Sequence, residues 1–246
     1  ERRQAFSEQA GRRLLVAMIN ATADERFEEK ARTELTDLEG AARYAYSLVA
    51  VASSLRQYLT KDEVVLAAGD NGGEVAEALQ ALVDRHLIVA FPPSYQYRAR
   101  HRVIADLVVE RLQELEELKD VLIGLAFATA SKINPALAKD ERPWRFLIRL
   151  MNHDFLGRVL GVMSAREVYV AIEGLVSFDY HYWLQRGSLE VQMGDLGLAT
   201  QFLNQARSLS PEDYLVQTAY GYLLMRKANE HRDRQYAHDH LVEGIA

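Results

Sequence analysis

Residues Tyr180–Pro211 read YHYWLQRGSLEVQMGDLGLATQFLNQARSLSP, and this stretch decides the fold. Two antiparallel helices can approach closely only where small side chains meet, because bulky side chains hold the axes apart. Three small residues stand where two such helices would cross: Gly187, Ala199 and Ala206. Trp183 and Leu203 have the volume to fill the gaps that remain. The pattern therefore predicts a helical hairpin with a close-packed seam.

The turn and the end of this hairpin carry their own signals. Gly194-Asp195 predicts the turn, with Asp195 as the cap of the second helix. Pro211 follows the second helix, where its missing N–H costs nothing. Together these positions, spread over about 34 residues, resemble one tetratricopeptide repeat (TPR). The resemblance implies that the segment binds or senses a partner rather than catalyses a reaction.

The composition bounds the class of protein. With 246 residues, the chain is long enough for two small domains. An apolar share of 49% and a charged share of 26% are typical of a globular chain rather than a disordered one. The net charge of −6 disfavours a general binder of nucleic acid or of acidic membranes. The sequence has no cysteine, which excludes disulfides, thiolate catalysis and cysteine-based zinc sites.

The sequence contains no apolar run near the roughly 20 residues that span a bilayer. It also shows no signal peptide, so we expect a cytoplasmic protein without membrane contact. The chain opens at Glu1 inside one helical pattern and closes at Ala246 inside another. We therefore expect a fragment of a longer protein.

The first half of the chain alternates helices with one hairpin. Thr60 and Glu63 have the spacing of a capping box, and residues 69–73 are expected to form a turn. Two strands, at 87–91 and 95–98, are the only β structure predicted. Helices are expected over 2–20, 24–38, 41–59, 61–68, 74–86 and 101–118. From residue 41 onward this is the order of a winged helix.

The remainder of the chain is expected to be wholly helical. Pro135 and Pro143 bracket a predicted loop, and a degenerate second repeat is marked by Gly221 and Ala237. Helices are predicted over 121–130, 144–152 and 165–176. The predicted fold class is mainly α, with three parts: a small helical domain over 1–40, a winged helix over 41–117 and a TPR-like α-solenoid over 118–246.

Tyrosines in the repeat region have two readings. They anchor a ligand, as exposed aromatic side chains often do, or they pack between helices, which we expect for most of them. The residues concerned are Tyr182, Tyr214, Tyr220 and Tyr222.

Signals for catalysis or metal binding are weak. The sequence contains no glycine-rich loop with Lys-Ser/Thr for a nucleotide phosphate, and residues 69–73 have acidic neighbours. Three histidines near the end lack a carboxylate at metal-ligand spacing: His231, His238 and His240. Four carboxylates are interleaved with Arg111 and Lys119 and predict a solvated helix face: Glu110, Glu114, Glu116 and Glu117. We expect no metal site and no catalytic residue.

The helix before the hairpin argues against DNA binding. In winged helices that read DNA, this helix enters the major groove. Here it carries three carboxylates, Glu74, Glu77 and Asp84, against Arg85 alone. Because basic contacts to phosphates dominate DNA affinity, we expect no direct DNA binding.

Four cationic residues gather where the second predicted strand gives way to a helix: Arg98, Arg100, His101 and Arg102. The N-terminus of a helix attracts anions through its free N–H groups and its dipole. One reading is therefore a phosphate site. The other is that these cations pair with the acidic helix over 74–84 or face water.

The order of these regions resembles the part of STAND-class signalling ATPases that follows the nucleotide-binding core. The class includes NLR immune receptors, apoptotic-protease activators and bacterial antiphage proteins. In this class the last helix of the winged helix often begins with Met-His-Asp, and the His touches the β-phosphate of ADP. Arg100-His101-Arg102 stands at that place and shares the His. Gly11-Arg12-Arg13 resembles, in position but without its Pro, a Gly-Leu-Pro-Leu helix near the nucleotide.

The resemblance implies a regulatory and protein-sensing region. The parent protein would bind ATP or ADP with Mg²⁺ in a core before Glu1, whereas this fragment alone would bind no cofactor and catalyse nothing. The implied partners are a protein ligand on the repeats and further copies of the parent on activation. Two alternatives remain: a winged-helix transcriptional regulator with repeats, and a simple TPR scaffold for protein–protein interaction.

Overall fold

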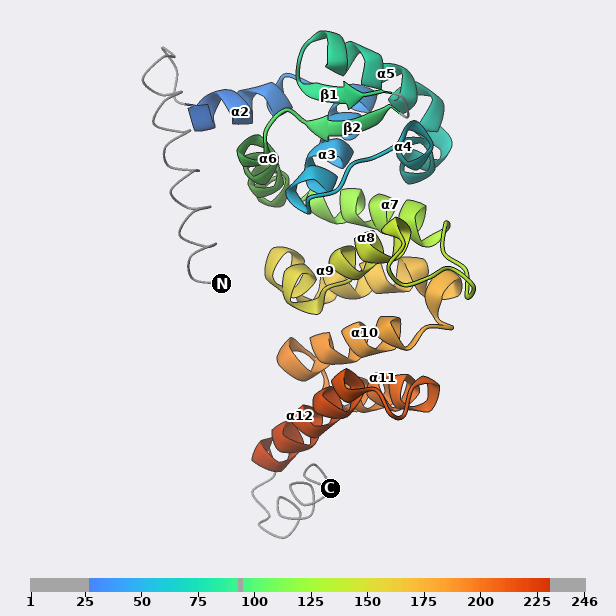
Figure 1. Cartoon of the computed structure of the whole chain (residues 1–246). Coiled ribbons are helices and arrows are strands. Elements are labelled where there is room, and N and C mark those ends of the chain that lie inside the picture. Colours follow the sequence, from blue (N-terminus) through green and yellow to red (C-terminus); the bar gives the residue numbers. More distant parts are fainter. Residues whose placement is uncertain (1–26, 93–94, 231–246) are drawn as a thin grey trace, which may run out of the picture. The chain divides into compact units, whose positions relative to one another are not determined.

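The computed structural model describes residues 27–92 and 95–230, and over these ranges the protein is mainly α. The prediction of a mainly α fold is confirmed. One two-stranded antiparallel sheet is present in the described ranges (Figure 1). The chain divides between Leu125 and Ala126 into two compact units.

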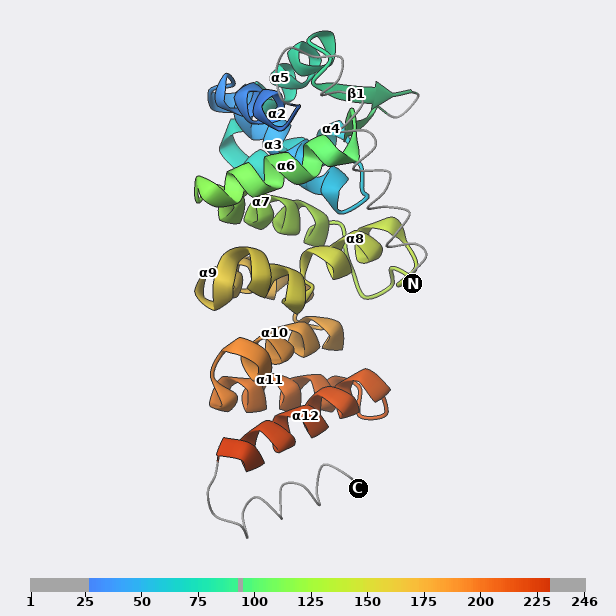
Figure 2. The same cartoon turned by 90° about the vertical axis from the view of Figure 1, so that its left-hand side faces the viewer.

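The first unit is built around one buried helix, α3. In chain order its elements are α2 (Phe27–Thr36), α3 (Gly40–Ser54), α4 (Lys61–Ala68), a 3₁₀ turn η1 (Gly69–Asn71), α5 (Gly72–Asp84), β1 (Ile88–Phe91), β2 (Gln96–Ala99), α6 (Arg102–Glu114) and α7 (Leu118–Ala130), which crosses the division. α3 is buried from Ala45 to Ala52 and packs against α5 and α6 (Figure 2). Its side chains there are small or apolar on every side of the helix, which suits a central position.

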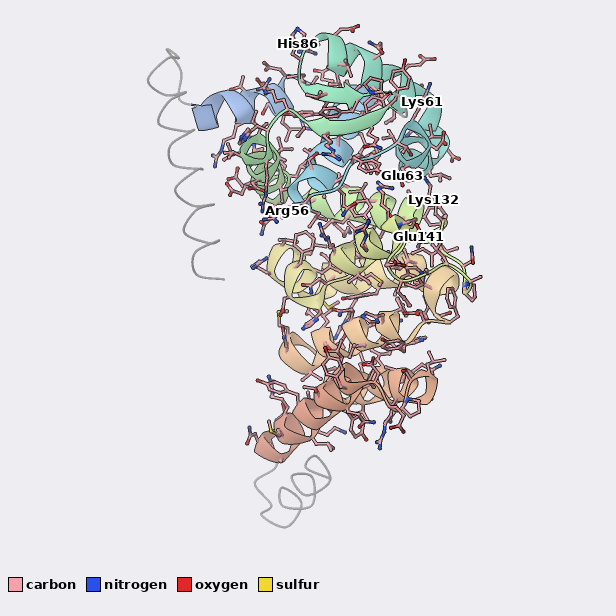
Figure 3. All side chains as sticks on the ribbon, viewed as in Figure 1. Arg56, Lys61, Glu63, His86, Lys132 and Glu141 are labelled. Carbon is pink, nitrogen blue, oxygen red and sulfur yellow. The ribbon has the colours of Figure 1, made fainter. Side chains whose placement is uncertain are left out.

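The start of α4 shows the predicted capping box. The Thr60 side chain accepts a hydrogen bond from the Glu63 main-chain N–H at 3.4 Å, and the Glu63 carboxylate accepts one from the Thr60 N–H at 2.9 Å. Glu63 lies at the first turn of this helix (Figure 3). The capping box is confirmed, and it sets where the chain turns from α3 into α4.

The predicted hairpin is confirmed, with Ile88 opposite Ala99 and Phe91 opposite Gln96. Within the described residues these are the two strands that the structure contains, and one isolated bridge adds to them. Leu59 forms an isolated antiparallel bridge with Tyr97, with N···O distances of 3.1 and 2.8 Å. The bridge is available because α3 ends at Ser54 rather than at residue 59. Arg56, which is labelled in Figure 3, lies just past that end. Its backbone is left-handed, with φ of 60°.

The segment 69–73 is not a plain turn. Residues 69–71 form η1, and α5 begins at Gly72, two residues before the predicted start. A Cβ at Gly72 would lie 2.8 Å from both Val65 Cγ1 and the Val65 carbonyl oxygen. Glycine is therefore needed there because α4 and α5 approach each other closely, a contact that no local turn signal reports.

The second unit contains α8 (Arg142–Leu150), α9 (His153–Val176), α10 (Tyr180–Met193), α11 (Leu196–Leu209) and α12 (Tyr214–Glu230). α10 packs against α9 and α11, and α11 packs against α12 (Figures 1 and 2). The helix predicted from residue 165 begins earlier, at His153, and is broken at Gly161, where φ is +73°. Pro143 lies in the first turn of α8 instead of in the loop, since no N–H is needed there.

The seam between α10 and α11 has the geometry that the small residues suggest. A Cβ at Gly187 would lie 2.7 Å from Leu203 Cγ, so the leucine packs directly on the α10 backbone. Ala199, Leu203 and Ala206 are fully buried in one apolar cluster, against which Trp183 packs partly buried. The Trp183 indole N–H donates to the Ser177 carbonyl at 2.7 Å.

The ends of α11 also follow the pattern. The Asp195 side chain accepts a hydrogen bond from the Leu198 N–H at 2.8 Å, so the predicted N-cap is confirmed. Pro211 lies two residues beyond the end of α11 at Leu209. Gly221 is in the middle of α12, and Ala237 lies outside the described residues.

The last turn of α10 contains a charge that the sequence did not single out. Glu190 is fully buried, and both of its oxygens accept hydrogen bonds from Arg166 of α9 at 2.7 Å. Its Oε2 also accepts the Asp195 main-chain N–H at 2.9 Å. A Cβ at Gly194 would lie 1.9 Å from the same Oε2. Glycine is therefore needed at position 194 for two reasons: it forms the turn, and any side chain there would collide with the Glu190 carboxylate.

The close packing of α11 on α10 predicts that alanine lowers the free energy of unfolding at Gly187 but raises it at Gly174, which lies outside the seam. Gly187→Ala places a methyl group against Leu203 and should lower the free energy of unfolding by about 1–3 kcal/mol. Gly174→Ala in α9 is the matched control. Its added Cβ meets nothing within 4 Å, so alanine's better helix propensity should stabilise by up to about 1 kcal/mol. Urea unfolding followed by circular dichroism measures both, and a Gly187→Ala protein as stable as the parent would contradict the packing.

Candidate functional site

A groove with a volume of about 280 Å³ lies in the second unit. Its two walls are α10 and α12, and the first residue of α9 closes one side. We refer to it as the α10–α12 groove. The residues that line it are His153, Leu184, Gln185, Ser188, Val191, Gln192, Leu215, Thr218, Ala219 and Tyr222.

The α10 wall of the groove carries three polar side chains, Gln185, Ser188 and Gln192, beside apolar ones, and His153 bonds both glutamines. The Gln185 side-chain oxygen accepts the His153 main-chain N–H at 3.0 Å and lies 2.8 Å from His153 Nδ1. The Gln192 amide nitrogen lies 3.0 Å from His153 Nε2. Because an amide oxygen only accepts, His153 Nδ1 donates to Gln185. His153 Nε2 faces both the Gln192 amide and the Asp154 carboxylate, whose Oδ1 lies 3.6 Å away.

The α12 wall is apolar and open to solvent. Tyr222 is 55% exposed and Leu215 is 39% exposed, although both are large hydrophobic side chains. Ala219 lies between them along the helix, and Leu184 and Val191 are buried on the α10 side. Exposed aromatic and aliphatic side chains beside buried ones are typical of a surface that receives a partner.

The four tyrosines separate into packing and exposed residues. Tyr182 is fully buried and donates its hydroxyl to the Tyr169 carbonyl at 3.1 Å, so it packs. Tyr220 packs partly buried against the apolar cluster. Tyr214 is exposed but does not line the groove, whereas Tyr222 does. Of the proposed anchors, Tyr222 is the one placed for binding.

The cationic residues at the start of α6 are not brought together as one free cluster. Arg100 donates two hydrogen bonds to the Glu34 carboxylate, at 2.6 and 2.7 Å, and one to the His86 carbonyl at 3.2 Å. The Arg98 guanidinium lies 5.3 Å from the ring centre of Tyr58. Arg100 therefore pairs with Glu34 of α2. Its partner is neither the acidic helix over 74–84 nor water, the two partners considered from the sequence.

His101 has a local structural role. Its Nδ1 accepts the Val103 main-chain N–H at 3.1 Å, so the side chain is the N-cap of α6. Neighbouring Arg102 is exposed and lies 4.0 Å from Asp106 one turn further on. His101 and Arg102 are both accessible to an anion, but capping engages one of the two imidazole nitrogens.

Two of the carboxylates predicted on a solvated face, Glu114 and Glu117, are partly exposed there and also form ion pairs. The Glu117 carboxylate accepts two hydrogen bonds from Arg43 of α3, at 2.8 and 3.1 Å. Glu114 bonds Arg111 at 2.9 Å and lies 3.4 Å from Arg32 of α2. The hydrogen bond from Arg111 lowers the pKa of Glu114. These carboxylates fasten α2 and α3 to the end of α6.

A second hollow, of about 430 Å³, lies in the first unit. Two of its lining residues, Glu74 and Asp120, are acidic. Burial and the neighbouring Asp120 raise the pKa of Tyr44, whose hydroxyl donates to the Ala67 carbonyl at 3.3 Å. A hollow with two carboxylates and a neutral phenol disfavours phosphate.

Several predicted residues lie outside the described ranges: Gly11, Arg12, Arg13, His231, His238 and His240. Among the helices that the structure describes, none is long and apolar enough to cross a membrane. Comparisons of the chain with protein families, with curated proteins and with solved structures find no match.

The capping role of His101 predicts a specific pattern of stability. His101→Ala leaves the Val103 N–H without its acceptor and should lower the free energy of unfolding by about 1 kcal/mol. His101→Asn supplies an oxygen that caps equally well and should restore it. Chemical denaturation of the 246-residue chain measures both. Equal losses in the two variants would show that the ring, rather than the cap, is what stabilises α6.

Proposed function

We propose that this chain is the regulatory and protein-sensing region of a STAND-type signalling ATPase, of the kind used in bacterial antiphage defence. The observation that carries the proposal is the α10–α12 groove, where polar side chains of α9 and α10 face the exposed Tyr222 and Leu215 of α12. The element order of the first unit adds support, because helices and a hairpin precede the repeat as in that class.

In this proposal the second unit binds a ligand protein and the first unit relays the event. The parent protein holds ATP or ADP with Mg²⁺ in a core before Glu1, works in the cytoplasm and self-associates on activation. The ligand must bind the active form more tightly than the resting form, because a ligand with equal affinity for both shifts nothing. No catalytic role is assigned to this chain.

The proposed contact with ADP involves the exposed edge of the α6 N-terminus. His101 retains its Nε2 for a phosphate oxygen while Nδ1 caps the helix, and Arg102 stands beside it. Arg100 is less suited, since a phosphate would have to replace the Glu34 carboxylate. The contact is therefore proposed for His101 first and Arg102 second.

Two observations on the parent protein test this function. Its coding sequence before Glu1 should contain a glycine-rich loop with Lys-Ser/Thr, and the purified protein should retain ADP. His101→Ala and His101→Asn should both lower the retained ADP about tenfold, because both remove the imidazole. Asn keeps the helix cap and so controls for folding. A missing phosphate loop, or ADP retention unchanged in both variants, would sink the proposal.

DNA binding separates this proposal from a transcriptional regulator. Glu74, Glu77 and Asp84 are exposed on α5, the helix that would enter the major groove. A gel-shift assay with random-sequence duplex at low salt should show no retarded band, because these carboxylates repel the phosphates. Tight binding that weakens as salt is added would favour the regulator instead.

A further inference from the structure

Met193, the last residue of α10, has a thioether that is both open to solvent and used in packing. The side chain is 44% exposed, yet its end covers the backbone of Gly157 in α9. We propose that Met193 is a site of reversible oxidation to the sulfoxide by a peroxide, and that the oxidation releases residues 153–160 from α10. This inference goes beyond the proposed function and does not rest on it.

The contact between Met193 and Gly157 leaves no room for a side chain at position 157. A Cβ there would lie 1.9 Å from Met193 Cε and 3.1 Å from Met193 Sδ. The same Cβ would lie 3.2 Å from Cδ1 of Leu189, which is fully buried. Gly157 is itself buried. The end of Met193 therefore closes one side of an apolar contact between α9 and α10, two helices that lie side by side (Figures 1 and 2).

The part of α9 that Met193 covers is separated from the rest of the helix by the break at Gly161. The backbone at Gly161 is not helical, with φ of +73° and ψ of 169°. A Cβ added there would meet nothing within 4 Å, so the break has space around it. Residues 153–160 are fastened to α10 by the hydrogen bonds of His153 with two glutamines and by the cover that Met193 provides.

The five methionines of the chain differ in what a peroxide can reach. Met151 is fully buried, whereas Met163, Met193 and Met225 are 67%, 44% and 44% exposed. Met18 lies outside the described residues. The sequence has no cysteine, whose thiolate would compete for the oxidant. A peroxide that meets this chain therefore reacts at exposed thioethers, and Met193 is one of them.

Met163 is more exposed than Met193, but its oxidation should change little. Its Sδ accepts a hydrogen bond from Nη1 of Arg166 at 3.4 Å. A sulfoxide oxygen accepts hydrogen bonds better than a thioether sulfur does, so this bond survives oxidation. Arg166 bonds the buried Glu190 carboxylate through its other two nitrogens, which Met163 does not touch. Met163 is therefore an internal comparison for Met193.

The proposed step transfers one oxygen atom to sulfur. A lone pair of Met193 Sδ attacks one oxygen of hydrogen peroxide, so that a sulfur–oxygen bond forms and the O–O bond breaks. The second oxygen leaves as water; the sulfur is oxidised by two electrons and the peroxide is reduced by two. A thiol-dependent sulfoxide reductase reverses the change, because two thiols become a disulfide and the sulfoxide oxygen leaves as water.

The sulfoxide no longer suits the apolar surface of Gly157 and Leu189. Burying its oxygen without a hydrogen-bond donor is unfavourable. Because Met193 is already partly in water, its oxidised end turns outward and is hydrated. Gly157 and Leu189 then lose the atoms that cover them, together with the dispersion contacts that those atoms supply. Residues 153–160 are consequently held by fewer contacts and open more often.

Amide hydrogen exchange of the 246-residue chain tests the proposal. Met18→Leu, Met163→Leu and Met225→Leu together leave Met193 and the buried Met151 as the methionines of the chain. Hydrogen peroxide is added, and peptide mass spectrometry follows both the added oxygen and the exchange. Exchange over residues 153–160 should rise about tenfold, whereas exchange over 165–176 should stay unchanged. Treatment with a sulfoxide reductase and dithiothreitol should restore the first rate.

Two substitutions at position 193 separate oxidation from packing. Met193→Leu keeps the volume and the apolar cover but has no sulfur, so peroxide should leave exchange over residues 153–160 unchanged. This variant retains Met163, so the same result shows that oxidation of Met163 is silent. Met193→Gln places a polar side chain of similar length there and should raise the exchange about tenfold without any oxidant.

Three results would overturn the proposal. The first is that Met193 is oxidised no faster than the buried Met151, because its exposure then gives the peroxide no access. The second is full oxidation of Met193 with exchange over residues 153–160 unchanged. The third is an equal rise over 165–176, which would mean that oxidation unfolds the region rather than releases the segment before Gly161.

Discussion

The second unit depends on the buried carboxylate of Glu190. Arg166 from α9 and the main chain of the α10–α11 turn satisfy this charge together, so three consecutive elements converge on one side chain. Removing one partner of a buried ion pair leaves the other charge uncompensated and costs about 3–5 kcal/mol. The pair therefore fixes α10 relative to α9. His153 lies on the other side of the break at Gly161, and its own bonds to Gln185 and Gln192 hold it beside α10.

The parts of the fold that were predictable from sequence have their partners close along the chain. The capping box of Thr60 with Glu63 and the cap at Asp195 join residues three positions apart, and the hairpin strands are nearly adjacent. Long-range pairs were not predictable. Arg166 and Glu190 are 24 residues apart, and Arg100 and Glu34 are 66 apart. A charged residue in a helical pattern is normally solvated, so nothing in the sequence marks these side chains as partners.

The residues of the candidate sites were predictable from the sequence to different degrees. Tyr222 was a candidate anchor because exposed aromatic residues bind well, but Tyr182 carried the same signal and is buried. Gln185 and Gln192 were missed because uncharged polar residues on a helix face usually meet only water. The cations around His101 had two readings, a shared phosphate site or separate pairing with the acidic helix or water. At the junction of a strand and a helix, however, the backbone changes direction at each residue and sends neighbouring side chains to different partners.

The groove positions Ser188, Thr218 and Tyr222 are separate from the residues that hold the helices together. The close seam uses Gly187 and Leu203, on other positions of the repeat. Substitutions at these three positions should therefore leave folding largely intact, whereas substitutions in the seam should not. Such a division means that the chemistry of the groove can change by single substitutions at these positions while the packing of the helices stays the same.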